Sequence, residues 1–163
     1  MSDDERLLRR AIALSEEAAR AGCEPFGAVV ARADGAIVGE GFNRSRLKHD
    51  PTSHGETEAI RDACARLGTL DLAGCTVFTS CEPCALCVAV MQITRITRVV
   101  YAAALADSAA VLGRPPGATA ALRAEAGLPV GQGRISASQA LRAEAVGVLE
   151  RVAAAGGVGV KPA

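Results

Sequence analysis

Two short segments constrain the fold and chemistry of this chain more than any other feature of its sequence. One reads H-G-E and begins at His54, and the other reads P-C-A-L-C and contains Cys84 and Cys87. A histidine and two cysteines are three zinc ligands, whereas a structural zinc ion is usually closed by four. Three ligands leave the fourth position to a water molecule that the metal can acidify. With the carboxyl group of Glu56 beside it to move protons, the pair predicts a hydrolytic zinc site.

The spacing of the two cysteines suits the start of a helix. Cys84 and Cys87 are three residues apart, so on a helix their sulfur atoms share one face and can reach one ion. Pro83 fits the first turn, where its missing N–H group costs nothing. The positive end of the helix also favours the thiolate that a metal needs. A C-x-x-C pair alone also fits a redox pair or two buried thiols, and the upstream H-x-E favours zinc.

The first segment also belongs at a helix start. His54 and Glu56 are two residues apart and would point to different faces in the middle of a helix. We therefore expect Ser53 as the N-cap, before an apolar-periodic run that begins at Ala59. Ser53 and Glu56 also fit a capping box, in which the glutamate only bonds back to the cap. The sequence leaves the structural and the catalytic interpretation of Glu56 open.

The pairing of H-x-E with P-C-x-x-C resembles the signature of zinc deaminases that act on nucleobases. Residues 43–103 are similar to the cytidine and guanine deaminase superfamily. The stretches DPTSHGETEAIR and TSCEPCALC, with PFGAVV and GFN upstream, resemble its bacterial guanine deaminase and tRNA adenosine deaminase branch over about residues 5–110, and TSCEPC followed by VVYAA favours guanine deaminase. The resemblance implies an α/β chain with a three-layer αβα cytidine-deaminase-like fold. A central mixed β-sheet would hold the zinc site at the N-termini of two helices.

The resemblance also implies roles for the site residues. His54, Cys84 and Cys87 would bind one Zn²⁺ ion per subunit. Glu56 would be the catalytic residue, carrying a proton from water to the ring nitrogen and then to the departing amine. A carbonyl group would replace the exocyclic amino group, and ammonia would leave. The implied substrate is a free nucleobase or nucleoside, with guanine or guanosine first and cytosine, cytidine or another aminated heterocycle as alternatives.

Four further residues resemble the substrate-binding positions of the family. Asn43 would hydrogen-bond the substrate, and the ring of Phe26 would pack against the base. The backbone of Ala28 and Gly55 would contact the polar edge of the substrate, because small side chains allow close approach.

The chain departs from guanine deaminases of this branch in two places. Residues 113–116 read G-R-P-P where that branch has a pair of aspartates, and residues 91–93 read M-Q-I where it has an aromatic residue. A second proton-shuttling carboxylate would therefore come from elsewhere, with Asp107, Glu125 and Glu144 as candidates. These departures make guanine the lead candidate among several rings.

Composition agrees with one catalytic domain, which we place at residues 1–155, followed by a flexible tail at 156–163. A chain of 163 residues can bury about two-thirds of its unfolded surface. Half of the residues are apolar, but no apolar run reaches the 18 or so that span a membrane. The acidic N-terminus is unlike a signal peptide, so we expect a cytoplasmic protein with reduced cysteines.

Charge bears on the partners. Eighteen basic and eighteen acidic residues cancel, whereas a polymer-binding enzyme is expected to show a basic excess. We therefore expect a small-molecule substrate and no nucleic acid or membrane as partner, and read the basic segment 44–49 as a solvated loop. A tRNA-editing deaminase and a noncatalytic zinc protein remain as alternatives, distinguished by salt-sensitive RNA binding and by an inert Glu56.

The hydrophobic pattern predicts helix, hairpin, helix, strand, helix and strand, then helices. Helices are expected at 5–20, 54–66, from 84 onwards, at 118–126 and at 136–154, and strands at 26–31, 37–42, 75–79 and 98–102. The last two strands flank a crossover helix and should be parallel. Residues 86–91 are apolar on nearly every side, so that helix should be buried in its own domain or against another subunit. Together with the resemblance, this predicts a homodimer.

Overall fold

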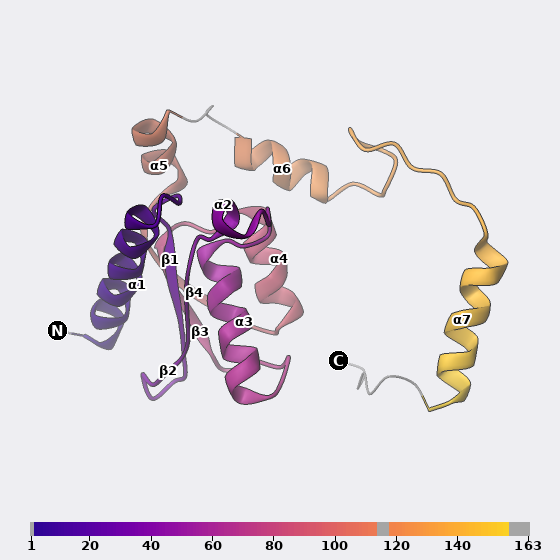
Figure 1. The fold of residues 1–163 in the computed structure, drawn as a ribbon, viewed down its shortest axis with the longest axis horizontal. Coiled ribbons are helices and arrows are strands. Elements are labelled where there is room, and N and C mark those ends of the chain that lie inside the picture. The colour runs from indigo at the N-terminus through magenta and orange to yellow at the C-terminus, as the bar shows by residue number, and fades with distance from the viewer. Residues whose placement is uncertain (1, 114–117, 157–163) are drawn as a thin grey trace. The chain divides into compact units, whose positions relative to one another are not determined.

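The structure, a computed structural model, describes residues 2–113 and 118–156 (Figure 1). The chain divides into two compact units, Met1–Arg123 and Ala124–Ala163. The first unit contains the sheet and the helices that pack on it. A single domain over residues 1–155 stays a prediction, and the tail expected at 156–163 lies outside the described residues except for Gly156. None of the described helices is long and apolar enough to cross a membrane.

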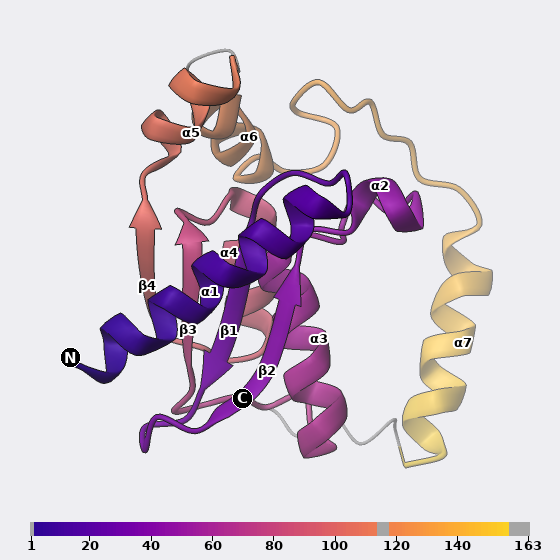
Figure 2. The ribbon, with the colours of Figure 1, turned by 60° about the vertical axis from the view of Figure 1, so that its left-hand side comes forward.

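Four strands form one mixed sheet in the order β2-β1-β3-β4. Their bounds are β1 Gly27–Ala31, β2 Ile37–Phe42, β3 Thr76–Cys81 and β4 Arg98–Ala103. β1 pairs antiparallel with β2, as expected for the predicted hairpin. It also pairs antiparallel with β3. β3 and β4 run parallel, as predicted for two strands that flank a crossover helix. Figure 2 shows the four strands side by side.

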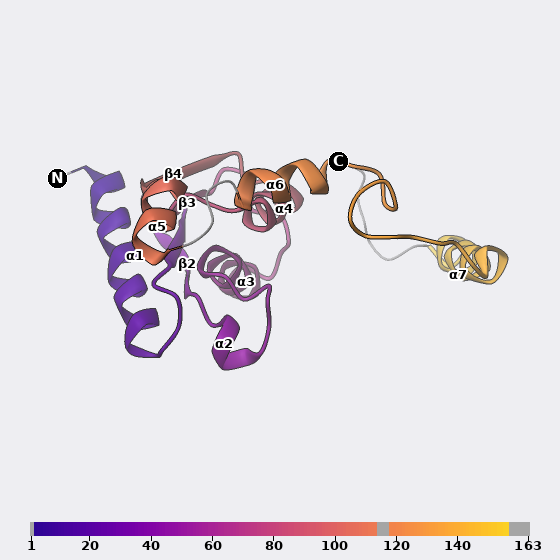
Figure 3. The ribbon, with the colours of Figure 1, turned by 90° about the horizontal axis from the view of Figure 1, so that it is seen from above.

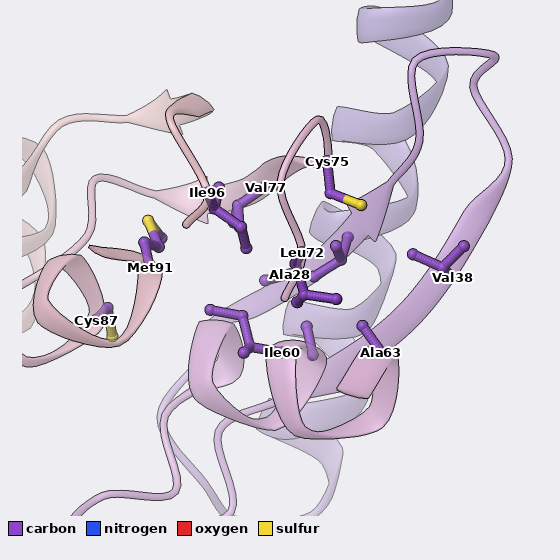
Figure 4. Packing of buried hydrophobic residues seen from close by; sticks show 12 residues of the cluster. Ala28, Val38, Ile60, Ala63, Leu72, Cys75, Val77, Cys87, Met91 and Ile96 are labelled. Atoms are coloured by element: carbon purple, nitrogen blue, oxygen red, sulfur yellow. The ribbon is translucent and has the colours of Figure 1, made fainter. Parts of the chain in front are cut away.

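Helices cover both faces of the sheet, which makes three layers (Figure 3). α1 (Asp3–Arg20) lies on one face, and α3 (Gly55–Leu67) and α4 (Ala85–Ile93) lie on the other. Successive residues of a strand point to opposite faces. Accordingly Val29 packs in the cluster with α1, while Ala28 and Val30 pack in the cluster with α3. Figure 4 shows the cluster on the side of α3, in which Ala28 lies near Ile60.

Glycines on the strands bring the helices unusually close to the sheet. A Cβ atom added to Gly39 would lie 2.3 Å from the carbonyl oxygen of Ala59, and one on Gly41 would lie 2.4 Å from the Ala59 nitrogen. On the other face, a Cβ on Gly27 would lie 2.5 Å from the Ala11 oxygen of α1. These positions therefore have no room for a larger residue, and they set the depth at which α1 and α3 pack.

The remaining helices differ more from expectation. A short α2 (Ser45–Lys48) occupies the basic segment that was predicted as a loop. α5 (Leu105–Leu112) follows β4, and α6 (Ala118–Ala126) has the predicted bounds. The last helix, α7 (Arg142–Ala154), begins six residues later than the predicted Ser136. Its N-cap Leu141 has φ 53°, a left-handed conformation that cannot continue a right-handed helix backwards.

α4 is not enclosed on every side in the monomer. Cys87 and Met91 are buried against the sheet side, but Ile93 is 77% exposed. Ile93 lies beyond the apolar run 86–91. Within that run Cys87 and Met91 are buried and Ala89 is exposed, so the domain itself covers one side of the helix. A dimer contact stays a prediction.

Candidate zinc and substrate site

The three predicted metal donors meet where two helices begin. His54 is the N-cap of α3, and Cys84 is the N-cap of α4, with extended backbone in both. Neither side chain caps its own helix, so both are available to a ligand. Cys87 lies one turn into α4 and is fully buried. The helix starts thus direct one imidazole and two thiols to a common point.

The distances between the donor atoms fit one zinc ion. The Sγ atom of Cys84 lies 3.5 Å from Nδ1 of His54, that of Cys87 lies 3.6 Å from it, and the two sulfurs are 3.7 Å apart. A tetrahedral ion with Zn–S bonds of about 2.3 Å and a Zn–N bond of about 2.05 Å requires separations of about 3.6 Å for S···N and about 3.8 Å for S···S. The described residues form this one cluster of three donors within 4.8 Å of one another.

The electrostatics of the cluster favour a bound cation. The hydrogen bond between the sulfur atoms of Cys84 and Cys87, assisted by His54 and opposed by burial, lowers the pKa of Cys84 to about 4. The same contact with Cys84, together with burial, raises the pKa of Cys87. The hydrogen bond with Cys84 raises the pKa of His54. Metal binding displaces protons from such ligands, because the metal takes the place of the proton at each donor atom.

Glu56 lies beside the donors and is buried, with 6% of its surface exposed. Burial is the main cause that raises the pKa of its carboxyl group, because a charged carboxylate loses its hydration there. A raised pKa suits a residue that must both accept and deliver a proton.

The capping-box interpretation of Glu56 is wrong, because Ser53 is not the N-cap of α3. The helix begins one residue later, and the backbone N–H of Glu58 donates to the His54 oxygen at 2.9 Å. The Ser53 carbonyl instead accepts the N–H of Arg44 at 2.9 Å. Arg44 lies outside the helix, so the sequence around Ser53 does not predict this contact.

A cavity opens beside the donor cluster. It is lined by the side chains of two predicted substrate residues, Phe26 and Asn43, together with His54, Glu56 and Cys84. Five more residues line it that the sequence reasoning did not assign to the site: Glu24, Cys81, Glu82, Leu105 and Ser108. Two of the three donors, His54 and Cys84, therefore border this cavity together with Glu56.

The comparisons with known proteins agree with this geometry. Residues 1–103 match the family model of the cytidine and deoxycytidylate deaminase zinc-binding region. The chain belongs to this deaminase family. Its members bind zinc and hydrolyse carbon–nitrogen bonds of cyclic amidines, so the predicted cofactor and enzyme class are confirmed.

Three relatives illustrate the range of the family. Guanine deaminase of Bacillus subtilis is 45% identical over 106 residues, which are 64% of this chain and 67% of the relative. Its solved structure matches with a TM-score of 0.81 and 34% identity over 97% of both chains. The tRNA-specific adenosine deaminase of Haemophilus influenzae is 35% identical over 61% of this chain and 58% of its own. The structure of NE0047 in complex with 2,6-diaminopurine matches with 27% identity and a TM-score of 0.63. The match covers 97% of this chain and 85% of NE0047.

The deaminase fold is thereby confirmed as the predicted three-layer arrangement, with the donors at two helix starts. Ala28 and Gly55, whose backbone was predicted to contact the substrate, are not among the described residues that line the cavity, whereas Asn43 and Phe26 are. Ala28 is fully buried in β1, and Gly55 is buried against the backbone of Phe26. Their role in substrate binding stays a prediction.

The candidates for a second acid have separate surroundings in this deaminase. Asp107 accepts a hydrogen bond from the backbone N–H of Ala104 at 2.8 Å at the start of α5. Glu125 and Glu144 belong to the second unit. Glu24 and Glu82 are the carboxylates of the first unit that line the cavity besides Glu56. Proximity to the C-x-x-C segment could have indicated Glu82, whereas nothing in the sequence marked Leu105 or Ser108.

Proposed function

We propose that this deaminase removes the exocyclic amino group of guanine or a guanine-type nucleoside, leaving a carbonyl group and releasing ammonia. The observation that carries the proposal is the buried carboxyl group of Glu56 beside a three-donor zinc cluster, in a cavity that Asn43 and Phe26 also line. The likeness to guanine deaminase of Bacillus subtilis over most of the chain supports guanine as the ring.

Each residue has a defined part in the proposed reaction. His54, Cys84 and Cys87 hold the zinc ion, which acidifies water when bound. Glu56 takes one proton from the water that adds to the amino-bearing carbon and delivers it to the ring nitrogen. It then carries the second proton, from the hydroxyl group so formed, to the amine, and the carbon–nitrogen bond breaks as ammonia leaves and the carbonyl group forms. Asn43 hydrogen-bonds the base, and Phe26 packs against it.

The charges around the cavity favour a small uncharged substrate over a phosphate-bearing one. Glu24, Glu56 and Glu82 line it, and no arginine or lysine does so among the described residues. Carboxylates repel phosphate, and a polynucleotide substrate needs basic contacts for its backbone. A tRNA adenosine deaminase is the alternative, supported by the relative of that name in Haemophilus influenzae. Cytosine or cytidine is a second alternative.

A homodimer is part of the proposal. The exposed Ile93 of α4 and the apolar surface of that helix support a subunit contact, because a helix that is apolar on every side needs a cover. Light scattering of the purified protein tests it. Location in the cytoplasm also stays a prediction from the sequence.

An ammonia-release assay across candidate rings tests the function. Purified zinc-loaded protein is offered guanine, guanosine, adenine, cytosine, cytidine and an aminated triazine, and a tRNA transcript is assayed for inosine at low and high salt. We expect ammonia from guanine or guanosine and no salt-sensitive editing of tRNA. Glu56→Gln keeps the size of the side chain and is the matched control, with activity reduced by about 10²-fold or more because proton transfer is lost.

Two outcomes would overturn the proposal. If no purine releases ammonia, the guanine assignment fails. If Glu56→Gln releases ammonia at the wild-type rate, Glu56 does not carry the proton and the proposed mechanism fails.

A further inference from the structure

A carboxylate next to the zinc-binding segment bonds to a helix that lines the cavity. Glu82 follows β3 directly and precedes Cys84 by two residues. Its Oε2 atom accepts a hydrogen bond from the backbone N–H of Leu105 at 3.1 Å. Leu105 is the first residue of α5, and Leu105 and Ser108 both line the cavity. Figure 2 shows α5 continuing from the end of β4, next to the end of β3.

α5 needs an acceptor from outside itself at this point. The first N–H groups of a helix have no partner within the helix. The N-cap of α5 is Ala104, whose methyl group cannot accept a hydrogen bond as serine or aspartate would. Asp107 does not replace it, because its carboxylate accepts the N–H of Ala104 itself. Glu82 therefore supplies the missing cap, and its negative charge suits the positive end of the helix.

The carboxylate of Glu82 is held on both oxygen atoms. Its Oε1 atom lies 3.7 Å from a guanidinium nitrogen of Arg123, which also donates to the Pro83 oxygen at 3.2 Å. Its backbone N–H donates to the Ala103 oxygen at 2.8 Å and extends the pairing of β3 with β4. Backbone and side chain of one residue thus join the zinc-binding segment to β4 and to α5.

We propose that Glu82 is a positioning residue, which fixes α5 against the zinc-binding segment and so sets the shape of the substrate cavity. It acts through Leu105 and Ser108, and it contributes no zinc donor. The effect on catalysis rests on the proposed deaminase function. The mechanical part, that Glu82 holds the start of α5, stands on the hydrogen bond alone.

Two variants of zinc-loaded protein separate this role from a chemical one. Glu82→Ala removes the acceptor, and we expect KM for guanine to rise about fivefold to tenfold, the effect of losing one N-cap, while kcat changes less than about twofold. Hydrogen exchange of the Leu105 amide should become faster by a similar factor. Glu82→Gln keeps an oxygen that can accept this bond and should restore both values to near wild type. Glu16→Gln, an exposed partner of Arg20 on α1, is the matched control and should change neither.

Several results would overturn the proposal. Unchanged exchange at Leu105 in Glu82→Ala would show that the carboxylate does not hold α5. A fall in kcat at constant KM would give Glu82 a part in the chemistry, and a loss of zinc in proportion to activity would make it a support of the metal instead. If Glu82→Ala does not fold, Glu82→Asp, shorter by one methylene, takes its place with the same readouts. A wild-type protein that releases no ammonia would contradict the proposed function, while the exchange measurement would still decide whether Glu82 anchors α5.

Discussion

The side chain of Asn43 bonds to the backbone of its own loop and also lines the cavity. The residue is 2% exposed, and its Oδ1 atom accepts the backbone N–H of Ser45 at 3.1 Å. No described residue accepts a hydrogen bond from its NH₂ group, and the side chain lines the cavity. The group left for a substrate is therefore a donor, which suits a ring nitrogen or carbonyl oxygen of a base.

Two substitutions of Asn43 separate these parts. Asn43→Asp keeps an oxygen for Ser45 but loses the NH₂ donor, so we expect a fall of about tenfold or more in kcat/KM, and the buried carboxylate should also lower stability at neutral pH, less so in acid, where it is protonated. Asn43→Ala loses both contacts and should lower stability at every pH. Steady-state kinetics and urea titration check the pair. Equal kcat/KM for Asn43→Asp and wild type would remove Asn43 from the substrate site.

At the scale of elements, the close packing of α3 on β2 depends on glycine. In Gly41→Ala the new methyl group would lie 2.4 Å from the Ala59 nitrogen, so the helix must move away. We expect the free energy of unfolding to fall by about 1–3 kcal/mol or more, the cost of overpacking. Chemical denaturation measures it. Gly147→Ala in α7 is the matched control and should raise the free energy of unfolding. Its Cβ would meet only an arginine side-chain atom at 3.4 Å, and alanine favours a helix.

A second contact between elements makes stability depend on pH. Arg10 of α1 donates two hydrogen bonds of 2.8 Å to the carboxylate of Glu40 on β2. This contact lowers the pKa of Glu40 below its usual value of 4.5. The stabilisation is therefore present above about pH 4.5 and is lost as the pH falls through the lower pKa of the folded state.

Glu40→Gln tests this dependence. We expect the variant to lose about 1 kcal/mol at pH 7 relative to wild type, and the difference to shrink as the pH falls below 4.5 and Glu40 becomes protonated. Urea titrations between pH 3 and pH 7 give the two curves. Glu16→Gln removes an exposed ion pair with Arg20 on α1 and is the control. Its free energy of unfolding should follow that of wild type at every pH. A difference that grows on acidification would contradict the assigned direction.

At the scale of the molecule, the zinc ion should hold the two helix starts together. His54 precedes α3, whereas Cys84 and Cys87 belong to α4, so one ion links two helices that no disulfide joins. We expect a chelator to lower the thermal midpoint, by an amount equivalent to about 3 kcal/mol when zinc had been present at a hundred times its Kd. Zinc should restore the midpoint of wild type but not of Cys84→Ser. An unchanged midpoint after chelation would show that zinc is bound without supporting the fold.

Much of the fold follows from local patterns in the chain. The two strand-like runs at 26–31 and 37–42, separated by a short turn, predicted the antiparallel pairing of β1 with β2 that the structure shows. Gly68 ends α3 in a left-handed conformation, as a glycine after an apolar-periodic run indicates. Short-range spacing also placed Cys84 and Cys87 on one helix start. Such features depend on neighbours within one turn or one strand, so sequence reasoning can reach them.

The rest was decided by contacts between distant segments. Ser53 looked like an N-cap, but its carbonyl bonds to Arg44 and the helix begins later. Glu82 became a cap for α5 only because β3 and β4 end side by side and bring it to Leu105. The sequence by itself therefore determined the candidate zinc donors, the strands with the pairing of β1 to β2 and of β3 to β4, and the family. The tertiary structure decided which side chains wall the cavity and where helices start, because hydrogen bonds across the chain outweigh local preferences there.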